Sequence, residues 1–323
     1  RRGRHRLGVH RRALADHADE PRPGGAGIGQ RPHHLGRLEA DPALRTAMEA
    51  ARRAGAILLE RWSRPVSGRA SKTTATDEVS DADHASEAAI VEIVRREHPD
   101  DAIVAEEGSN AAGRSGRRWL VDPLDGTINY LYRIPQWSVS IACLDRDGPL
   151  VGVVLDPVRG ELFFAQRGHG AWLRPMAATA AAGDVRALSV TTVSDPALAL
   201  LASGFSYDSE ERREQARREG HLVATVRDVR RFGSAALDLA WVACGRIDVY
   251  LESVGSEWDW AAGRLLVTEA GGRVSEVEGV RAGVPGLLAS GPRVHDALLA
   301  LVTSVQRDEE RMTARGWKGA KPP

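Results

Sequence analysis

The chain has 323 residues, of which 42% are hydrophobic, and the 44 Lys and Arg residues balance the 44 Asp and Glu residues. This composition supports a sizeable core, excludes global disorder and gives no sign of a nucleic-acid or membrane partner. We find no apolar run near the ~20 residues of a membrane span, and no secretory signal at the Arg- and His-rich start. Cys143 and Cys244 lie in apolar stretches, so we expect reduced core thiols in a cytoplasmic protein.

Residues 1–40 combine Arg, His, Pro and Gly without sustained periodicity, so we expect a disordered N-terminal extension. The sequence GAGIG at residues 25–29 is similar to a dinucleotide-binding loop. We reject that interpretation, because a Pro-containing segment precedes it instead of a strand. We divide the rest of the chain into an N-terminal half over 41–186, a C-terminal half over 187–305 and a charged tail over 306–323.

In the N-terminal half, Asp41 is a good helix N-cap and Pro42 suits the first helical position. Apolar residues at helical spacing continue to Trp62, and Pro99 stops a second helix. Short apolar runs predict buried strands, and runs separated by turns predict an antiparallel meander. The expected elements are helices over 42–62 and 80–98, strands over 102–105 and 119–121, and the meander over 137–172.

In the C-terminal half, helical patterns alternate with short apolar runs. The expected elements are helices near 209–226, over 233–244, over 259–270 and over 292–305, with a strand over 247–251. The order of elements therefore predicts an α+β half followed by an α/β half.

Three acidic clusters lie where an apolar strand ends or a helix begins. They contain the pair Glu106 and Glu107, the pair Asp122 and Asp125, and Asp259. In open α/β architectures the carboxyl ends of strands form the ligand crevice, so we expect these carboxylates to converge. Carboxylates without a nearby His or Cys favour a hard cation, Mg²⁺ before Mn²⁺.

The middle cluster also has the groups that a phosphate needs. Asp122 stands at the tip of a predicted strand, Asp125 and Gly126 follow, and Thr127 supplies a hydroxyl. A helix that starts here points free N–H groups at an anion, which suits phosphoryl chemistry. Taken singly, each cluster has an ordinary explanation as a turn, a solvated pair or, for Asp259, an N-cap. Only the three together predict a metal site.

These clusters resemble the signatures of the inositol monophosphatase family. Residues 122–127, with the sequence DPLDGT, match the first signature, and residues 258–272 match the second. Glu106 and Glu107 stand at the family's acidic pair, and the resemblance extends over about residues 42–304. It implies a layered αβαβα sandwich, Mg²⁺ dependence, lithium sensitivity and a homodimer.

The resemblance also implies roles for single residues. Two Mg²⁺ ions, with a weaker third and Mn²⁺ as an alternative, would be held by Glu106, Asp122, the Leu124 carbonyl, Asp125 and Asp259. The catalytic residues would be Thr127 and Asp83, which orient the attacking water, with Glu106 and Lys72. Glu107 would contact the metal-binding residues and not the metal itself. Lys72 also has a simpler explanation, as a solvated loop residue.

Substrate binding is implied in the same way. The residues concerned are Asp125, the backbone N–H groups of Gly126 and Thr127, Ser234, Ala235, Glu252 and Asp259. Ser234 could instead be an N-cap and Glu252 a surface residue, but their joint presence favours a polyol phosphate. The chain departs from the family pattern at Ile128, Tyr130 and residues 131–133, which affects substrate fit and no metal ligand.

The implied reaction is hydrolysis of a small phosphate monoester, myo-inositol 1-phosphate first, by metal-activated water. The same chemistry leaves fructose 1,6-bisphosphate, histidinol phosphate, a nucleotide 3′-phosphate and NADP open as substrates. A rival of another class is a regulatory factor that binds proteins. We expect neither a membrane nor a nucleic-acid partner.

Overall fold

The computed structural model describes residues 38, 40–62, 70–71, 78–79, 81–176, 184–253, 255–281 and 283–314. Nearly all of the predicted N-terminal extension and Lys72 lie outside the described residues.

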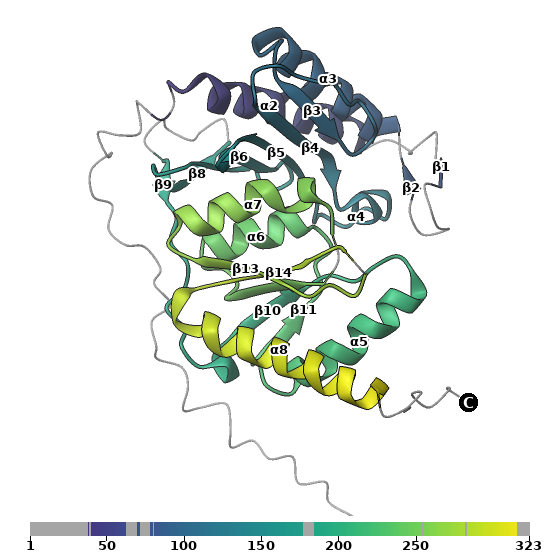
Figure 1. Ribbon diagram of the computed structural model, residues 1–323. Helices are drawn as coiled ribbons and strands as arrows, with labels where there is room; N and C mark the ends of the chain where they lie inside the picture. Colours follow the sequence, from purple (N-terminus) through teal and green to yellow (C-terminus); the bar gives the residue numbers. More distant parts are fainter. Residues whose placement is uncertain are drawn as a thin grey trace, which may run out of the picture. The chain divides into compact units, whose positions relative to one another are not determined.

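The described residues form helices and sheets in alternating layers (Figure 1). The α-helices are α2 (Pro42–Trp62), α3 (Asp81–Glu97), α4 (Thr127–Leu131), α5 (Ser209–Val223), α6 (Ala235–Ala243), α7 (Glu257–Glu269) and α8 (Pro292–Ala314). A short 3-10 helix, η1, covers Pro196–Leu198, and a two-stranded sheet pairs β1 (Ala70–Ser71) with β2 (Glu78–Val79).

Two larger sheets separate the helical layers. The seven-stranded sheet contains, in spatial order, β3 (Ala102–Ala105), β4 (Arg118–Asp125), β5 (Ser138–Asp145), β6 (Gly148–Asp156), β7 (Glu161–Gln166), β8 (Ala171–Pro175) and β9 (Arg186–Ala187). The five-stranded sheet contains, in spatial order, β11 (Asp228–Arg230), β10 (Leu200–Ser203), β12 (Val249–Glu252), β14 (Gly286–Ser290) and β13 (Arg273–Val277). Both sheets mix parallel and antiparallel pairs.

Helices cover both sheets, which gives the predicted αβαβα order. In Figure 1, α2 and α3 cover the outer face of the seven-stranded sheet, α6 and α7 lie between the sheets, and α5 and α8 cover the far face of the five-stranded sheet. Three buried clusters fill the spaces between these layers. The fold prediction is confirmed. The division of the chain at residues 186 and 187 remains a prediction.

The central strands read as continuous apolar runs because both faces of their sheet are covered. On β5, the side chains of Val139, Ile141 and Cys143 enter the core beneath α2 and α3. Those of Ala142 and Leu144 enter the opposite core, beneath α6 and α7. This alternation is the two-residue period of a strand.

Some predicted boundaries were wrong. The final helix does not stop at residue 305 but continues to Ala314, because charged residues and Ala sustain a helix after the apolar pattern ends. Cys143 is buried, Cys244 is partly buried, and both are free thiols. Within the described ranges, none of the helices is long and apolar enough to cross a membrane.

Candidate active site

The first carboxylates of the site are brought together by two parallel strands. β3 and β4 pair in parallel, and Glu106, the residue after β3, donates its N–H to the carbonyl of Val121 on β4 at 3.1 Å. Asp122 and Asp125 belong to β4 itself, so the predicted end of this strand at Val121 was wrong. The pairing of β4 with β5 is irregular between Asp122 and Asp125. Such an irregularity re-aims side chains, which the apolar pattern alone does not show.

Gly126 turns the chain from β4 into the five-residue helix α4. Its φ of 94° lies in the left-handed region, which favours glycine. A Cβ at this position would lie 3.0 Å from the carbonyl oxygen of Gln136 and 3.1 Å from that of Gly233. Glycine is therefore required here both by conformation and by space.

Asp259 reaches the site from the helical layer between the sheets. Helix α7 starts at Glu257 and not at Asp259, so the predicted start was wrong. Ser256 is the N-cap, and Asp259 lies in the first turn, where its Oδ2 accepts the N–H of Ser256 at 2.7 Å. This carboxylate bond back to the N-cap favours a helix start two residues earlier than the apolar pattern indicates.

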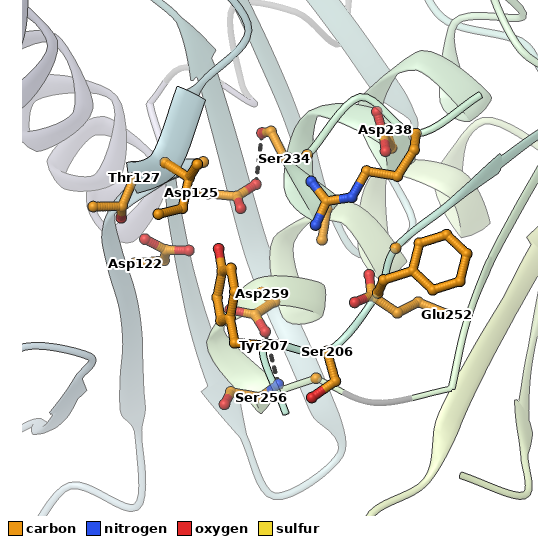
Figure 2. A pocket seen from close by; sticks show the side chains of 18 of the residues that line it. Asp122, Asp125, Thr127, Ser206, Tyr207, Ser234, Asp238, Glu252, Ser256 and Asp259 are labelled. Carbon is orange, nitrogen blue, oxygen red and sulfur yellow. Dashed lines mark hydrogen bonds between the residues drawn. The ribbon is translucent and has the colours of Figure 1, made fainter. Parts of the chain in front are cut away.

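The predicted residues meet in one cavity of about 650 Å³. The predicted site residues that line it are Glu106, Asp122, Leu124, Asp125, Gly126, Thr127, Ser234, Ala235, Glu252 and Asp259. Figure 2 shows Asp122, Asp125 and Thr127 on one side of this cavity and Glu252 on the other, with Asp259 between them. The two ends differ in chemistry and suit different parts of a ligand.

Asp83 and Glu107 lie behind the cavity wall. Asp83 is fully buried on α3, and the Thr127 hydroxyl lies 3.5 Å from its Oδ2 and donates to the Leu124 carbonyl at 3.0 Å. The side chain of Glu107 is 2% exposed and lies 3.8 Å from His84. Thr127 and Asp83 therefore adjoin each other, as expected for a pair that acts together.

Burial and mutual repulsion raise the pKa of the clustered carboxyls. For Asp122 the pKa lies well above its ordinary value, first because of burial and then because of the charges of Glu106, Asp125 and Asp259. The pKa of Asp259 is raised for the same reasons. That of Asp125 rises to about 6 through burial, against hydrogen bonds from Ser234 and Ala236 that lower it. Carboxyls that repel one another in this way are suited to a shared cation.

The carboxylate oxygens are of the type that binds a hard cation, but the side chains are not arranged to bind one. Across the described residues, no three His, Cys, Asp or Glu side chains are arranged so that they could hold a metal ion. Hydrogen bonds hold one oxygen of each aspartate: Leu124 N–H to Asp122 Oδ1 at 3.0 Å, Ser256 N–H to Asp259 Oδ2, and Ser234 Oγ to Asp125 Oδ2 at 2.6 Å. A cation would therefore require side-chain rotation within the cluster.

The opposite end of the cavity is built around Glu252. Its Oε2 accepts the hydroxyl of Tyr250 at 2.6 Å, and a Cβ on Gly204 would overlap its carboxylate. Burial raises the pKa of Glu252 to about 7, against the opposing effects of Tyr250 and Arg231. Glu252 is thus fixed inside the pocket by a hydrogen bond and is not a surface residue.

Ser234 begins α6, as the N-cap alternative predicted, but its hydroxyl is used elsewhere. It donates to Asp125 Oδ2 and lies 3.1 Å from the hydroxyl of Ser138 (Figure 2). Ser234 is therefore in direct contact with a candidate metal ligand.

Other cavity residues were not anticipated from the sequence. They include Ser203, Phe205, Ser206, Tyr207, Asp208, Glu211, Arg231, Asp238 and Arg281. Asp238 is 2% exposed, and its Oδ1 has no hydrogen-bond partner among the described residues. The available signal was position, because residues 204–208 follow a short apolar run as Glu106 and Asp122 do.

Comparisons with known proteins agree with this architecture. Residues 39–311 match the inositol monophosphatase family. The Nus factor SuhB of Escherichia coli (strain K12) is 38% identical over 263 residues, which covers 80% of this chain and 95% of that protein. The Nus factor SuhB of Pasteurella multocida (strain Pm70) is 37% identical over 273 residues, covering 83% and 98%.

Solved structures show the same fold. The inositol monophosphatase from Anabaena (Nostoc) sp. PCC 7120 matches with a TM-score of 0.70 at 37% identity, covering 83% of this chain and 97% of that one. The extragenic suppressor protein suhB from Bartonella henselae matches with a TM-score of 0.73 at 31% identity, covering 81% and 98%. These matches place the chain in a phosphatase superfamily. It belongs to the inositol monophosphatase family.

Proposed function

We propose that this protein is a Mg²⁺-dependent phosphatase that hydrolyses myo-inositol 1-phosphate. The observation that carries the proposal is one cavity with two different ends. At one end Glu106, Asp122, Asp125 and Asp259 crowd together, and burial with mutual repulsion raises the pKa of Asp122 and Asp259. At the other end Glu252 presents a hydrogen-bonding carboxylate, which suits hydroxyl groups.

The roles of the chain's own groups follow from this geometry. The four carboxylates, with the Leu124 carbonyl, would hold two to three Mg²⁺ ions, or Mn²⁺ in their place. When bound, such ions neutralise the phosphate charge and activate water. Thr127 lies beside Asp83 and would orient the attacking water. The N–H groups of Gly126 and Thr127 would hold the phosphate.

Substrate turnover tests this proposal directly. We expect phosphate release that depends on Mg²⁺, is abolished by EDTA, and is fastest with myo-inositol 1-phosphate. The comparison set is fructose 1,6-bisphosphate, histidinol phosphate, a nucleoside 3′,5′-bisphosphate and NADP. Faster turnover of another ester would retain the metal site and contradict the assignment of Glu252. No turnover of any ester would contradict the enzymatic function.

The Glu252 end should discriminate between leaving groups. Replacing Tyr250 by Phe removes the hydroxyl that holds Glu252 and should raise KM for myo-inositol 1-phosphate about tenfold with little change in kcat. Phenyl phosphate has no leaving-group hydroxyls and is the matched control substrate. Equal effects of Tyr250→Phe on both esters would show that Glu252 does not recognise hydroxyls.

A second candidate function rests on the names of the relatives. Two relatives at 37% and 38% identity are called Nus factor SuhB, so we also propose a protein-binding regulatory role. Capture of a protein partner that is unaffected by Asp122→Asn would support a role separate from catalysis. A homodimer and lithium sensitivity remain predictions from the family, and a cytoplasmic location remains a prediction from the cysteines.

A further inference from the structure

We propose that Ser86 and Glu87 of α3 are positioning residues. They would hold the two metal-binding segments, residues 106–109 and residues 122–125, at the separation that metal binding requires. The inference rests on the proposed function, because it assumes that Glu106, Asp122 and Asp125 bind metal. Neither residue lines the cavity. Both act on the backbone that carries the carboxylates.

Glu87 holds the turn that follows Glu106. Its side chain is buried, with 2% exposure, and its two oxygens accept different backbone N–H groups. Oε2 accepts the N–H of Glu107 at 2.7 Å, and Oε1 accepts that of Ser109 at 3.0 Å. The peptide between Glu106 and Glu107 is therefore fixed directly by Glu87, while the N–H of Glu106 is held by Val121.

Ser86 holds the neighbouring segment. Its fully buried hydroxyl donates to the carbonyl of Pro123 at 2.8 Å, and Pro123 lies between Asp122 and Asp125. Together with Asp83, which lies beside Thr127, these residues have the spacing i, i+3 and i+4 of one helix face. One face of α3 thus contacts both metal-binding segments.

This arrangement matters because the carboxylates repel one another. Repulsion between Glu106 and the aspartates favours any motion that separates their segments. Contacts behind metal ligands commonly alter metal affinity by about 10- to 100-fold when they are removed. α3 opposes the separation through hydrogen bonds to main-chain groups, of which those to Glu87 involve a charged acceptor.

Glu87→Gln is the sharpest test. The amide replaces one acceptor oxygen by an NH2 donor, so it cannot accept the N–H groups of Glu107 and Ser109 on two separate oxygens as Glu87 does. Binding of Mn²⁺ to the full chain is measured without substrate, from the loss of the free-ion signal in electron paramagnetic resonance. We expect the Mn²⁺ dissociation constant to rise about tenfold or more. Ser86→Ala should raise the Mn²⁺ dissociation constant by a smaller factor. This second variant tests the proposal if Glu87→Gln does not fold.

Glu219→Gln is the matched control, because Glu219 is also a buried helical glutamate but is hydrogen-bonded to Ser203 on β10. Its Mn²⁺ affinity should stay within about twofold of wild type. A lower melting temperature of Glu87→Gln and Ser86→Ala with unchanged Mn²⁺ affinity would overturn the proposal and leave the phosphatase function intact. Failure of the wild-type chain to bind Mn²⁺ would overturn the metal site and the proposal together.

Discussion

Asp122→Asn is expected to abolish phosphate release and, at the same time, to raise the melting temperature of the metal-free protein. Asp122 is 2% exposed, and burial, followed by the charges of neighbouring carboxylates, raises its pKa well above the ordinary value. Asparagine removes this repulsion and keeps an acceptor for the N–H of Leu124. It also removes a charged ligand, so we expect turnover to fall by about a thousandfold or more.

Opposite effects on activity and stability distinguish a functional carboxylate from a structural one. Asp145→Asn is the matched control, because Asp145 forms a 2.8 Å ion pair with Arg167 that holds its pKa below the ordinary value. That change should lower the melting temperature slightly and leave activity unchanged. Phosphate release and thermal unfolding in EDTA provide both readouts. Near-normal turnover by purified Asp122→Asn would exclude Asp122 as a metal ligand.

The second large effect is a pH-dependent stabilisation by Mg²⁺. The folded-state pKa values of Asp125 and Glu252 are raised to about 6 and about 7, from ordinary values of 3.8 and 4.5. Between the ordinary and the raised values the folded state binds more protons than the unfolded state. The free energy of unfolding of the metal-free protein therefore falls as pH rises through this range.

Magnesium should counteract that loss, because it binds carboxylates only in their ionised form. We expect Mg²⁺ to raise the melting temperature by about 5 °C at pH 8 and by almost nothing at pH 5. The measurements start at pH 5 and not lower, because ion-paired acids such as Asp145 are still ionised there. Asp125→Asn should flatten the metal-free pH profile. A stabilisation by Mg²⁺ that does not change with pH would contradict the carboxylate site.

Much of the site could be predicted because its strongest signals are short. Residues 122–127 place two carboxylates, a glycine and a hydroxyl within one turn, and Gly126 does have the left-handed conformation that its position required. The layered fold could also be predicted, since runs such as residues 150–155 are apolar throughout and so must be covered on both faces.

Other features depended on contacts that no local pattern contains. The extension of β4 to Asp125 arises from its irregular pairing with β5, which a strand pattern does not show. The sequence of α3 predicted a helix, but not that Glu87 accepts two N–H groups about 20 positions further along the chain. Likewise, Ser234 could be placed at a helix start, but its bond to Asp125 joins residues 109 positions apart.

The sequence by itself therefore determined which carboxylates and which glycine-containing turn are candidates for the site, the alternation of helices and strands, and the resemblance to the family. Only the tertiary structure decided how those groups are held, which residues stand behind them, and that Glu252 faces the carboxylates across one cavity. The physical reason is that donor type and backbone freedom are properties of single residues and their neighbours. Hydrogen-bond partners and shared burial exist only after distant segments have packed together.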